Sequence, residues 1–281
     1  MRLAVIISAL IAALALVLRE MAWAVVGLGL RILRGLPGWL RRHVGERPFA
    51  LRLSQRYPRS SAAVGARLGA GFTGLPLTLL CLAVLYLAAL FGGMVEDLLE
   101  TEGLVRLDTV INQWLQNWRV PQLVALFAWV TVLGDSATLI AVGLVGTGFL
   151  WAHHRSGLVL PLWVAFLGSQ ATTWLGKFAL GRHRPDFVTE VTALSASFPS
   201  AHATGAMAVY GFLAYAIARD LPEIRQRFEL SFWTAILILV VSFSRMFLSV
   251  HFASDVAAGL AVGGFWLLVG FVVAEYLRLR R

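Results

Sequence analysis

Long apolar stretches separated by short charged segments make up most of this 281-residue chain. Most of the stretches reach the ~20 residues that an α-helix needs to cross a bilayer. The stretches are residues 3–33, 72–94, 123–152, 158–177, 201–218, 231–248 and 255–276. This pattern predicts an all-α polytopic membrane bundle, in which one N-terminal helix precedes a core of six membrane helices.

The first stretch is interrupted by Arg19 and Glu20 and has some features of a secretion signal. Ala22-Trp23-Ala24 has the small-x-small form of a cleavage site. However, only Arg2 precedes the apolar run, and a strongly basic segment follows it. We therefore expect an uncleaved membrane helix.

The stretch at residues 123–152 is interrupted at Gly134-Asp135-Ser136. This sequence is typical of a helix end followed by a new N-cap, so we expect an interfacial helix and then a span from Ser136. Because ionisable residues at membrane depth are often functional, the alternative is that Asp135 is part of a proton relay.

Residues 110–118 carry Trp114 and Trp118, and tryptophan prefers the membrane–water interface. We expect a second interfacial helix here. It follows an acidic segment that contains Glu96, Asp97, Glu100, Glu102 and Asp108.

The composition excludes a soluble globular protein, because 59% of the residues are hydrophobic, only 14% are charged, and the mean hydropathy is +0.77. The formal net charge of +9 is also compatible with nucleic-acid binding. However, the basic residues gather in short segments between apolar stretches, as the positive-inside rule expects. We therefore expect a membrane partner and no nucleic acid. The single cysteine, Cys81, cannot form an internal disulfide, and neither zinc-ligand spacing nor a glycine-rich phosphate loop occurs.

The basic segments fall on one side of the predicted membrane, which the positive-inside rule identifies as the cytoplasm. They are residues 34–67, 153–155, 219–227 and 278–281. The same alternation places residues 181–200 and 244–255 together on the opposite face. The predicted domains are residues 1–68, a membrane helix with a basic cytoplasmic linker, and residues 69–281, a membrane-embedded domain.

Three ionisable residues, Arg245, His251 and Asp255, stand just before the last apolar stretch. If residues 251–255 are helical, His251 and Asp255 lie about 40° apart around the axis and about 6 Å apart along it. The carboxylate could then hold one imidazole nitrogen. A histidine oriented in this way beside an arginine predicts a nucleophile that attacks an anion.

A basic segment runs from Lys177 through Arg182 to Arg184. Lys177 and Arg184 share a face if the preceding helix persists, although Gly181 and Pro185 favour ending it. The planar donors of arginine suit phosphate oxygens. On its own, the segment is equally consistent with contact to lipid headgroups.

Residues 197–202 read Ser-Phe-Pro-Ser-Ala-His and precede another apolar stretch. Pro199 and Ser200 stand where a helix would begin, and a helix N-terminus can bind phosphate oxygens. His202 could then donate a proton to a leaving oxygen. In isolation, the simpler interpretation is that Ser200 is an N-cap and His202 an interfacial side chain.

Taken together, the three motifs resemble the signature of the type 2 phosphatidate phosphatase superfamily, which includes the vanadium-dependent haloperoxidases. Lys177, six residues, Arg184 and Pro185 match the first part. Ser244-Arg245, five residues, His251, three residues and Asp255 match the third. In the second part Ala201 replaces the usual glycine, so it keeps the backbone N–H but loses access to positive φ. The resemblance covers about residues 70–276.

The resemblance implies a role for each matching residue. His251 would attack phosphorus to form a phosphohistidine, Asp255 would orient it, and His202 would protonate the leaving alkoxide and then activate water. The expected phosphate-binding residues are Lys177, Arg184, Ser200, Ala201, Arg245 and Arg182. No metal or other cofactor is expected. Because the two histidines need opposite protonation states, we predict a bell-shaped pH profile for activity.

The expected activity is hydrolysis of a lipid phosphate or pyrophosphate, in the class of phosphatidate, phosphatidylglycerol phosphate or undecaprenyl pyrophosphate. The expected location is the periplasmic face of a bacterial inner membrane. Lipid-to-lipid phosphotransfer and a non-catalytic transporter or scaffold for anionic lipids are the alternatives. His183 is expected to be a solvated loop residue, and His43, His153 and His154 to be catalytically silent.

Overall fold

The computed structural model describes residues 2–40, 55–59, 62, 75–100, 102–185 and 195–280. Throughout these ranges every regular element is a helix, which confirms the all-α prediction. The chain divides into two compact units, Met1–Leu75 and Pro76–Arg281.

The first unit contains helix α1 (Arg2–Leu40), which is continuous. Arg19 and Glu20 form an ion pair of 2.6 Å within it and do not break it. Its segment Ala13–Ile32 is long and apolar enough to cross a bilayer. Most of the predicted basic linker, including His43, lies outside the described residues.

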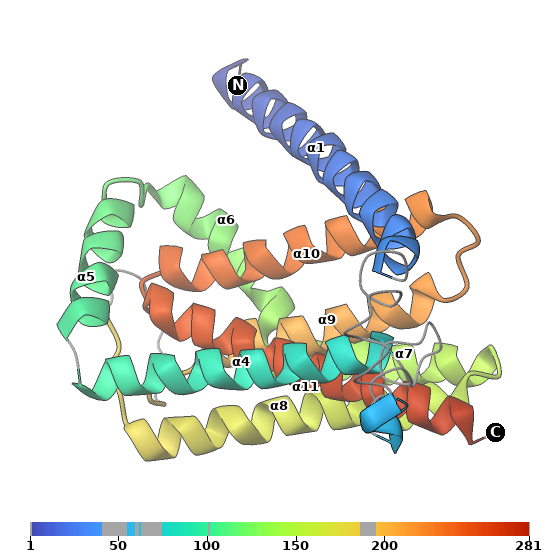
Figure 1. Cartoon of the computed structure of the whole chain (residues 1–281). Coiled ribbons are helices and arrows are strands. Elements are labelled where there is room, and N and C mark those ends of the chain that lie inside the picture. Colours follow the sequence, from blue (N-terminus) through green and yellow to red (C-terminus); the bar gives the residue numbers. More distant parts are fainter. Residues whose placement is uncertain are drawn as a thin grey trace. The chain divides into compact units, whose positions relative to one another are not determined.

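The second unit carries the three motifs (Figure 1). Its helices are α4 (Leu75–Glu100), α5 (Glu102–Gln116), α6 (Pro121–Thr131), α7 (Ser136–Ala152), α8 (Val159–Leu180), α9 (Ala201–Ala218), α10 (Ile224–Phe247) and α11 (Ala253–Leu279), with short 3-10 turns η2 (Val132–Gly134) and η3 (Ser156–Leu158). Figure 1 shows α5 lying across the end at which α8 and α10 finish and α11 begins.

Five helices of this unit, α4 and α8 to α11, are long and apolar enough to span a bilayer by length and composition. Helices α6 and α7 meet this criterion only as a pair, which is bent by 47° at the predicted break. If the bent pair counts as one span, the described residues contain α1 and six further spans. This agrees with the predicted architecture.

The outer surface of the second unit is apolar, as expected for side chains that face lipid. Trp129 and Phe178 are 80% and 82% exposed. Exposed tryptophans also mark both ends of the unit: Trp114 and Trp118 lie at the α5 end, and Trp151 lies at the far end of α7. Such placement is typical of the aromatic belts at membrane interfaces.

Helices α8, α9 and α11 pack closely around a core that includes Leu162, Phe212 and Leu267. The contact between α9 and α11 depends on glycine. A Cβ atom on Gly259 would lie 2.7 Å from the Ser200 carbonyl oxygen, and one on Gly263 would lie 2.6 Å from the Thr204 carbonyl oxygen. The two backbones therefore meet directly, without an intervening side chain.

Helices α5 and α10 begin about two turns earlier than the sequence pattern predicts. Helix α5 begins at Glu102, so Asp108 lies within a helix and is buried. Helix α10 begins at Ile224, where Arg225 and Glu229 form an ion pair of 2.9 Å across one turn. Polar helical turns of this kind lie outside the apolar stretches, so hydropathy alone misses them.

Candidate active site

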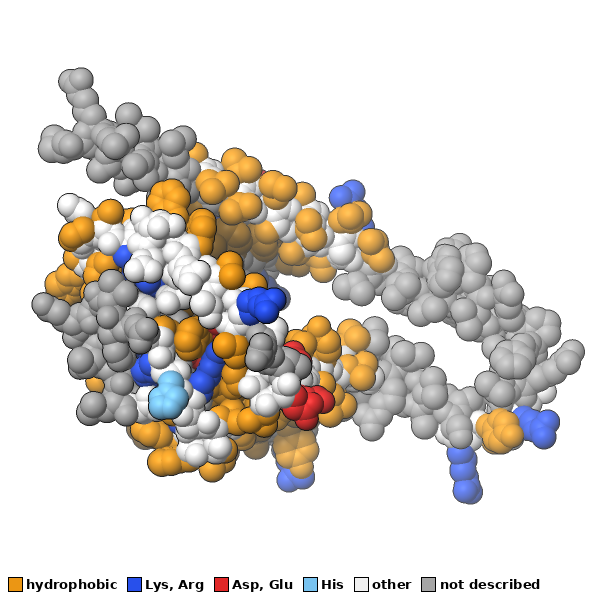
Figure 2. All heavy atoms as spheres, turned by 90° about the vertical axis from the view of Figure 1, so that its left-hand side faces the viewer, with side chains coloured by type: hydrophobic (Ala, Val, Ile, Leu, Met, Phe, Trp, Pro, Cys, Tyr) orange, Lys and Arg blue, Asp and Glu red, His pale blue; other side chains and the backbone are white. Residues whose placement is uncertain are grey.

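The three motifs meet at the α5 end of the second unit. Ser197 N donates to the Arg182 carbonyl at 2.8 Å, and Ser200 N donates to the Asp255 carbonyl at 3.0 Å. These backbone bonds join the segment after α8, the segment before α9 and the first turn of α11. Figure 2 faces this end and shows basic side chains and a histidine grouped among apolar and uncharged atoms. The predicted meeting of residues 181–200 with 244–255 is therefore observed for the residues described.

Arg184 links two of these segments. Its Nε donates to the Ser195 carbonyl at 2.8 Å and its Nη1 to the Val250 carbonyl at 2.6 Å. The same Nη1 lies 3.3 Å from His251 Nε2. Burial lowers the pKa of the Arg184 guanidinium from its ordinary 12.5, yet a guanidinium remains charged at neutral pH. A fixed positive charge therefore stands beside the imidazole nitrogen that is predicted to attack phosphorus.

Lys177 reaches the same place from the last turn of α8, although the helix ends at Leu180 and Gly181 has a left-handed φ of 55°. Lys177 is buried, and its Nζ donates to Ser195 Oγ at 3.3 Å and to the Ala196 carbonyl. Arg184 Nη2 also donates to Ser195 Oγ at 3.3 Å. The two cations thus converge on one serine without sharing a helix face.

His251 does not lie on a helix. Helix α11 begins at Ala253, so the prediction that His251 and Asp255 occupy one helix is wrong. Their contact nevertheless forms, because the turn before α11 returns the ring to Asp255, with Nδ1 3.5 Å from Oδ2. This separation is longer than a strong hydrogen bond. Burial lowers the pKa of the His251 imidazole to about 3, so the ring is neutral at neutral pH.

Asp255 is fully buried and holds the N-terminus of α11. Its Oδ2 accepts from the Phe252 backbone N–H at 2.8 Å, as a carboxylate does in a capping box, and also from Ser197 Oγ. Its Oδ1 accepts from Arg182 Nη1 at 2.6 Å. The carboxylate is therefore fixed in position from several directions.

Arg182 is directed toward carboxylates. Its Nη2 pairs with Asp108 at 2.7 Å, while its Nη1 serves both Asp255 and Ser254 Oγ, the latter at 2.7 Å. Its guanidinium also lies over the Phe252 ring, 4.4 Å from the ring centroid. Arg182 was predicted to bind phosphate, but its observed contacts are with carboxylates. Two buried acids use the same planar donors that a phosphate would need.

Asp108 completes this arrangement from α5. Besides Arg182, it accepts from Ser254 N at 2.9 Å and from Ser254 Oγ. Asp108 was assigned only to an acidic segment before the predicted interfacial helix, so this role was not predicted. The available signal was its position between the apolar residues Leu107 and Val110, within a stretch that can form an amphipathic helix.

Ser200 and Ala201 stand at the start of α9, with Ser200 as the N-cap and Ala201 as the first helical residue. Ala201 has no positive φ, so the turn is an ordinary one that alanine adopts without strain. The Ser200 side chain makes no cap hydrogen bond. Its Oγ is buried and has no hydrogen-bond partner within the described parts of the chain.

His202 lies in the first turn of α9 and contacts Asp135. Its Nε2 is 2.7 Å from Asp135 Oδ1, across the bend between α6 and α7. Asp135 occupies the predicted N-cap position of α7, but its side chain makes no cap bond. Gly134 permits this approach, because a Cβ atom there would lie 3.0 Å from His202 Cδ2.

Arg245 is buried near the end of α10. Its Nη1 donates to Thr131 Oγ1, and its carbonyl accepts from His251 N at 3.2 Å. Its Nε is buried and has no partner among the residues that the structure describes. Arg119, which the motifs do not include, supports this region by donating to the Phe247 carbonyl at 2.6 Å and the Met246 carbonyl at 3.1 Å.

The other histidines that the structure describes lie apart from these contacts. His183 is exposed in the segment after α8, as predicted. His153 and His154 are exposed after α7, at the opposite end of the unit. Within the described ranges, no three His, Cys, Asp or Glu side chains converge as metal ligands would. The expectation that no metal takes part stays a prediction.

Residues 158–279 match the PAP2 superfamily. Phosphatidylglycerophosphatase B from Bacillus subtilis (strain 168) is 30% identical over 181 residues, which cover 63% of this chain and 87% of that protein. A crystal structure of a transmembrane PAP2-type phosphatidylglycerolphosphate phosphatase from B. subtilis shares 25% identity with a TM-score of 0.63, covering 70% of this chain and 97% of that chain.

The structure of Aquifex aeolicus LpxE is 22% identical, with a TM-score of 0.47, and covers 61% of this chain and 94% of that one. Together, the apolar spans and the similarity to the transmembrane B. subtilis structure confirm the prediction of an integral membrane protein.

Proposed function

The chain belongs to the PAP2 superfamily, and we propose on this basis that it is a membrane phosphatase that hydrolyses a lipid phosphate through a phosphohistidine at His251. The proposed catalytic domain is residues 69–281. The basic segments on the far side of the bundle support an active site on the extracytoplasmic face of a bacterial inner membrane.

The observation that carries this proposal is a set of hydrogen-bond donors contributed by all three motifs. Ser200 Oγ and Arg245 Nε have no hydrogen-bond partner among the described residues, and Arg184 Nη1 lies 3.3 Å from His251 Nε2. Buried polar atoms are usually paired, so the unpaired Ser200 Oγ and Arg245 Nε call for an acceptor. Phosphate oxygens are suitable acceptors, because they are anionic and each accepts several hydrogen bonds.

In the first step, His251 Nε2 attacks phosphorus while the bond between phosphorus and the lipid oxygen breaks. His202 gives a proton to the departing lipid alkoxide, which leaves as an alcohol. Lys177, Arg184 and Arg245 stabilise the negative charge on the equatorial phosphoryl oxygens. Asp255 stabilises the positive charge that His251 gains when its N–P bond forms.

In the second step, water replaces His251 on phosphorus. The now neutral His202 accepts a proton from the attacking water, and the N–P bond breaks to release inorganic phosphate. His251 regains its neutral ring and His202 its proton, so both residues return to their starting states.

Asp135 has a positioning role in this mechanism. A carboxylate bonded to His202 Nε2 fixes the plane of the ring and stabilises its positive charge. The other ring nitrogen, Nδ1, is then the one that exchanges the proton with the lipid oxygen and with water. This assignment develops the proton-relay alternative for Asp135.

Arg182 and Asp108 also have a positioning role, because they hold the Asp255 carboxylate. Arg182 joins Asp255 to Asp108, so the carboxylate beside the nucleophile is held from α5 as well as from its own helix. A charge that acts in the transition state is most effective when it need not reorganise. We therefore assign Arg182 to the support of Asp255 rather than to phosphate.

The substrate proposed for the first assay is phosphatidylglycerol phosphate, because the curated relative is named a phosphatidylglycerophosphatase. Phosphatidate and undecaprenyl pyrophosphate complete the panel, since both present the same phosphoryl group. The measurement is phosphate release by the purified full chain in detergent with a chelator present.

His251→Ala should lose at least about 1,000-fold in kcat, because it removes the nucleophile. Its thermal unfolding in detergent should remain cooperative, which separates loss of chemistry from loss of fold. Activity equal to that of the natural chain would refute the phosphohistidine mechanism. Incubation with labelled lipid phosphate and a lipid alcohol tests for phosphotransfer: label on the second lipid, without release to water, would exclude hydrolysis.

A further inference from the structure

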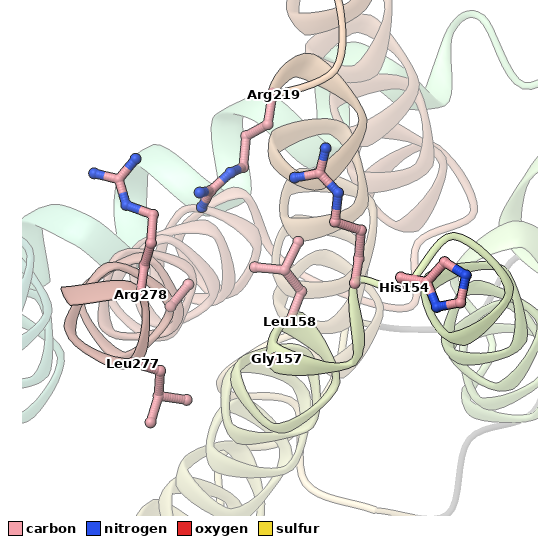
Figure 3. A pocket seen from close by; sticks show the side chains of 8 residues that line it. His154, Gly157, Leu158, Arg219, Leu277 and Arg278 are labelled. Carbon is pink, nitrogen blue, oxygen red and sulfur yellow. The ribbon is translucent and has the colours of Figure 1, made fainter. Parts of the chain in front are cut away.

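A second basic site lies at the other end of the same helices. A cavity of about 170 Å³ is lined by Arg155 and Leu158 before α8, Arg219 after α9, and Arg278 near the end of α11. Figure 3 shows Arg219 and Arg278 extending from separate helices, with Leu158 nearby. None of these residues belongs to the motifs of the candidate active site.

The two sites are separated by about the thickness of a membrane. At 1.5 Å per residue, His202 and Arg219 lie about 26 Å apart along α9, and Val159 and Lys177 lie about 27 Å apart along α8. The hydrocarbon core of a bilayer is about 30 Å thick. The cavity is therefore at the headgroup level of the leaflet opposite the candidate active site.

The arginines are held in place but retain unused donors. Glu275 pairs with Arg219 at 2.9 Å and with Arg278 at 2.7 Å, and Asp220 pairs with Arg155. Each guanidinium carries five N–H donors, and these pairs use only some of them. Three arginines against two carboxylates leave a net charge of +1 on this cluster. The Arg155 and Arg278 side chains are 44% and 56% exposed, so a ligand can reach them.

The cavity has room for a small group of heavy atoms, such as a phosphate with adjoining glycerol atoms. Leu158, Ala274 and Leu277 line it beside the arginines. A site with charge on one side and apolar atoms on the other suits the boundary between a headgroup and its acyl chains.

An apolar groove reaches the same arginine from the membrane side. It has a volume of about 720 Å³ and runs between α7 and α9, past Val145, Phe149 and Ile217, to Arg155 and Asp220. Because Arg155 lines both spaces, one molecule could place its phosphate in the cavity and an acyl chain along the groove. A phospholipid has this combination of groups.

We propose that this cavity binds the phosphate of an anionic phospholipid from the leaflet opposite the active site, with an acyl chain in the groove between α7 and α9. Zwitterionic lipids fit less well, because their ammonium group would face the arginines. The site is separate from catalysis and would stand even if the proposed hydrolysis were wrong.

Native mass spectrometry of the purified full chain with phosphatidylglycerol or phosphatidylcholine tests this proposal. We expect phosphatidylglycerol to be retained at least 10-fold more strongly, and Arg155→Gln with Arg278→Gln to abolish that difference. Arg227→Gln is the matched control, since Arg227 is exposed at the same end and lines neither space. Equal retention by the double variant and the control would overturn the proposal.

Three further measurements locate the ligand. Arg184→Gln should leave the lipid preference intact, whereas its loss would mean that the lipid had bound at the candidate active site. Val145→Trp should weaken retention of long-chain phosphatidylglycerol but not of a short-chain form; equal effects would exclude the groove. If inorganic phosphate stabilises the natural chain in phosphatidylcholine nanodiscs as strongly as phosphatidylglycerol does, and the Arg155→Gln with Arg278→Gln variant loses this stabilisation, the cavity binds free phosphate and the lipid assignment fails.

Discussion

The two ends of the α8, α9 and α11 bundle carry similar cations in opposite physical states. At the candidate active site, Lys177 and Arg245 are 6% and 4% exposed and are bonded to backbone carbonyls or a buried hydroxyl. At the far end, the Arg155 and Arg278 side chains are about half exposed, and they pair with Asp220 and with the largely buried Glu275. Buried charges are costly but fixed, which suits a transition state, whereas exposed charges can adapt to a mobile headgroup.

The largest effect on activity is expected when one of the fixed charges at the candidate active site is removed. Arg184→Gln should lower kcat/KM by about 1,000-fold, because Arg184 lies beside the attacking nitrogen and stabilises charge that develops on phosphate. Steady-state phosphate release measures it. His183→Gln, which changes the exposed neighbour of Arg184, is the control and should stay within about twofold. A similar loss in both variants would mean that the segment as a whole, rather than the fixed charge, is needed.

The next largest effect is expected at Asp135. Asp135→Asn should reduce kcat by about 100-fold while changing KM little, since it weakens a general acid and leaves the phosphate ligands in place. The alkaline limb of the pH profile should also move to lower pH, because His202⁺ loses its carboxylate partner. A change in KM alone, with an unmoved pH profile, would contradict the positioning role.

A smaller effect on rate, but a clear one on stability, is expected at Arg182. Arg182→Gln leaves Asp108 and Asp255 buried without their cation, which should cost about 3 kcal/mol of unfolding free energy and about 10-fold in kcat. Thermal unfolding and initial rates measure the two effects. Restoration of rate, but not of stability, by higher substrate concentration would instead indicate that Arg182 binds phosphate.

The smallest predicted effect is the pH dependence contributed by His251. Its folded-state pKa of about 3 lies below the ordinary 6.5, so between these values the unfolded chain binds a proton that the folded chain excludes. Stability from this residue is complete above pH ~6.5 and falls as the pH drops. Between pH ~6.5 and ~5 the natural chain should lose about 2 kcal/mol more than His251→Gln. An equal loss of thermal stability in the two proteins over this pH range would show that burial of His251 does not contribute to the pH dependence.

Much of the fold was predictable, because membrane helices are specified by local hydropathy. The break at Gly134-Asp135-Ser136 was also local, since glycine and an N-cap residue mark a helix boundary. Helix α5 was predicted too short because its first two turns mix apolar with charged residues, so neither hydropathy nor tryptophan placement revealed them.

The sequence predicted which residues form the candidate site, because they occur in spaced motifs, but it did not predict how those residues contact one another. His251 and Asp255 have helical spacing, but a turn before α11 brings them together instead. The partnership of His202 with Asp135 joins residues 67 positions apart, which no local pattern encodes. Arg182 shows a further limit: one guanidinium suits phosphate and carboxylate equally, and only the fold determines which of them it meets.

The glycine contact between α9 and α11 restricts how this protein can acquire a new substrate range. Ser200 and Thr204 carbonyls meet Gly259 and Gly263 so closely that any larger residue would push apart the helices that carry His202 and Asp255. Selection for a different lipid therefore has to act on surrounding helices such as α4, whose exposed Leu85 and Tyr86 can change without moving the catalytic groups. Packing thus fixes the positions of the proposed catalytic groups, while exposed residues at the periphery can change.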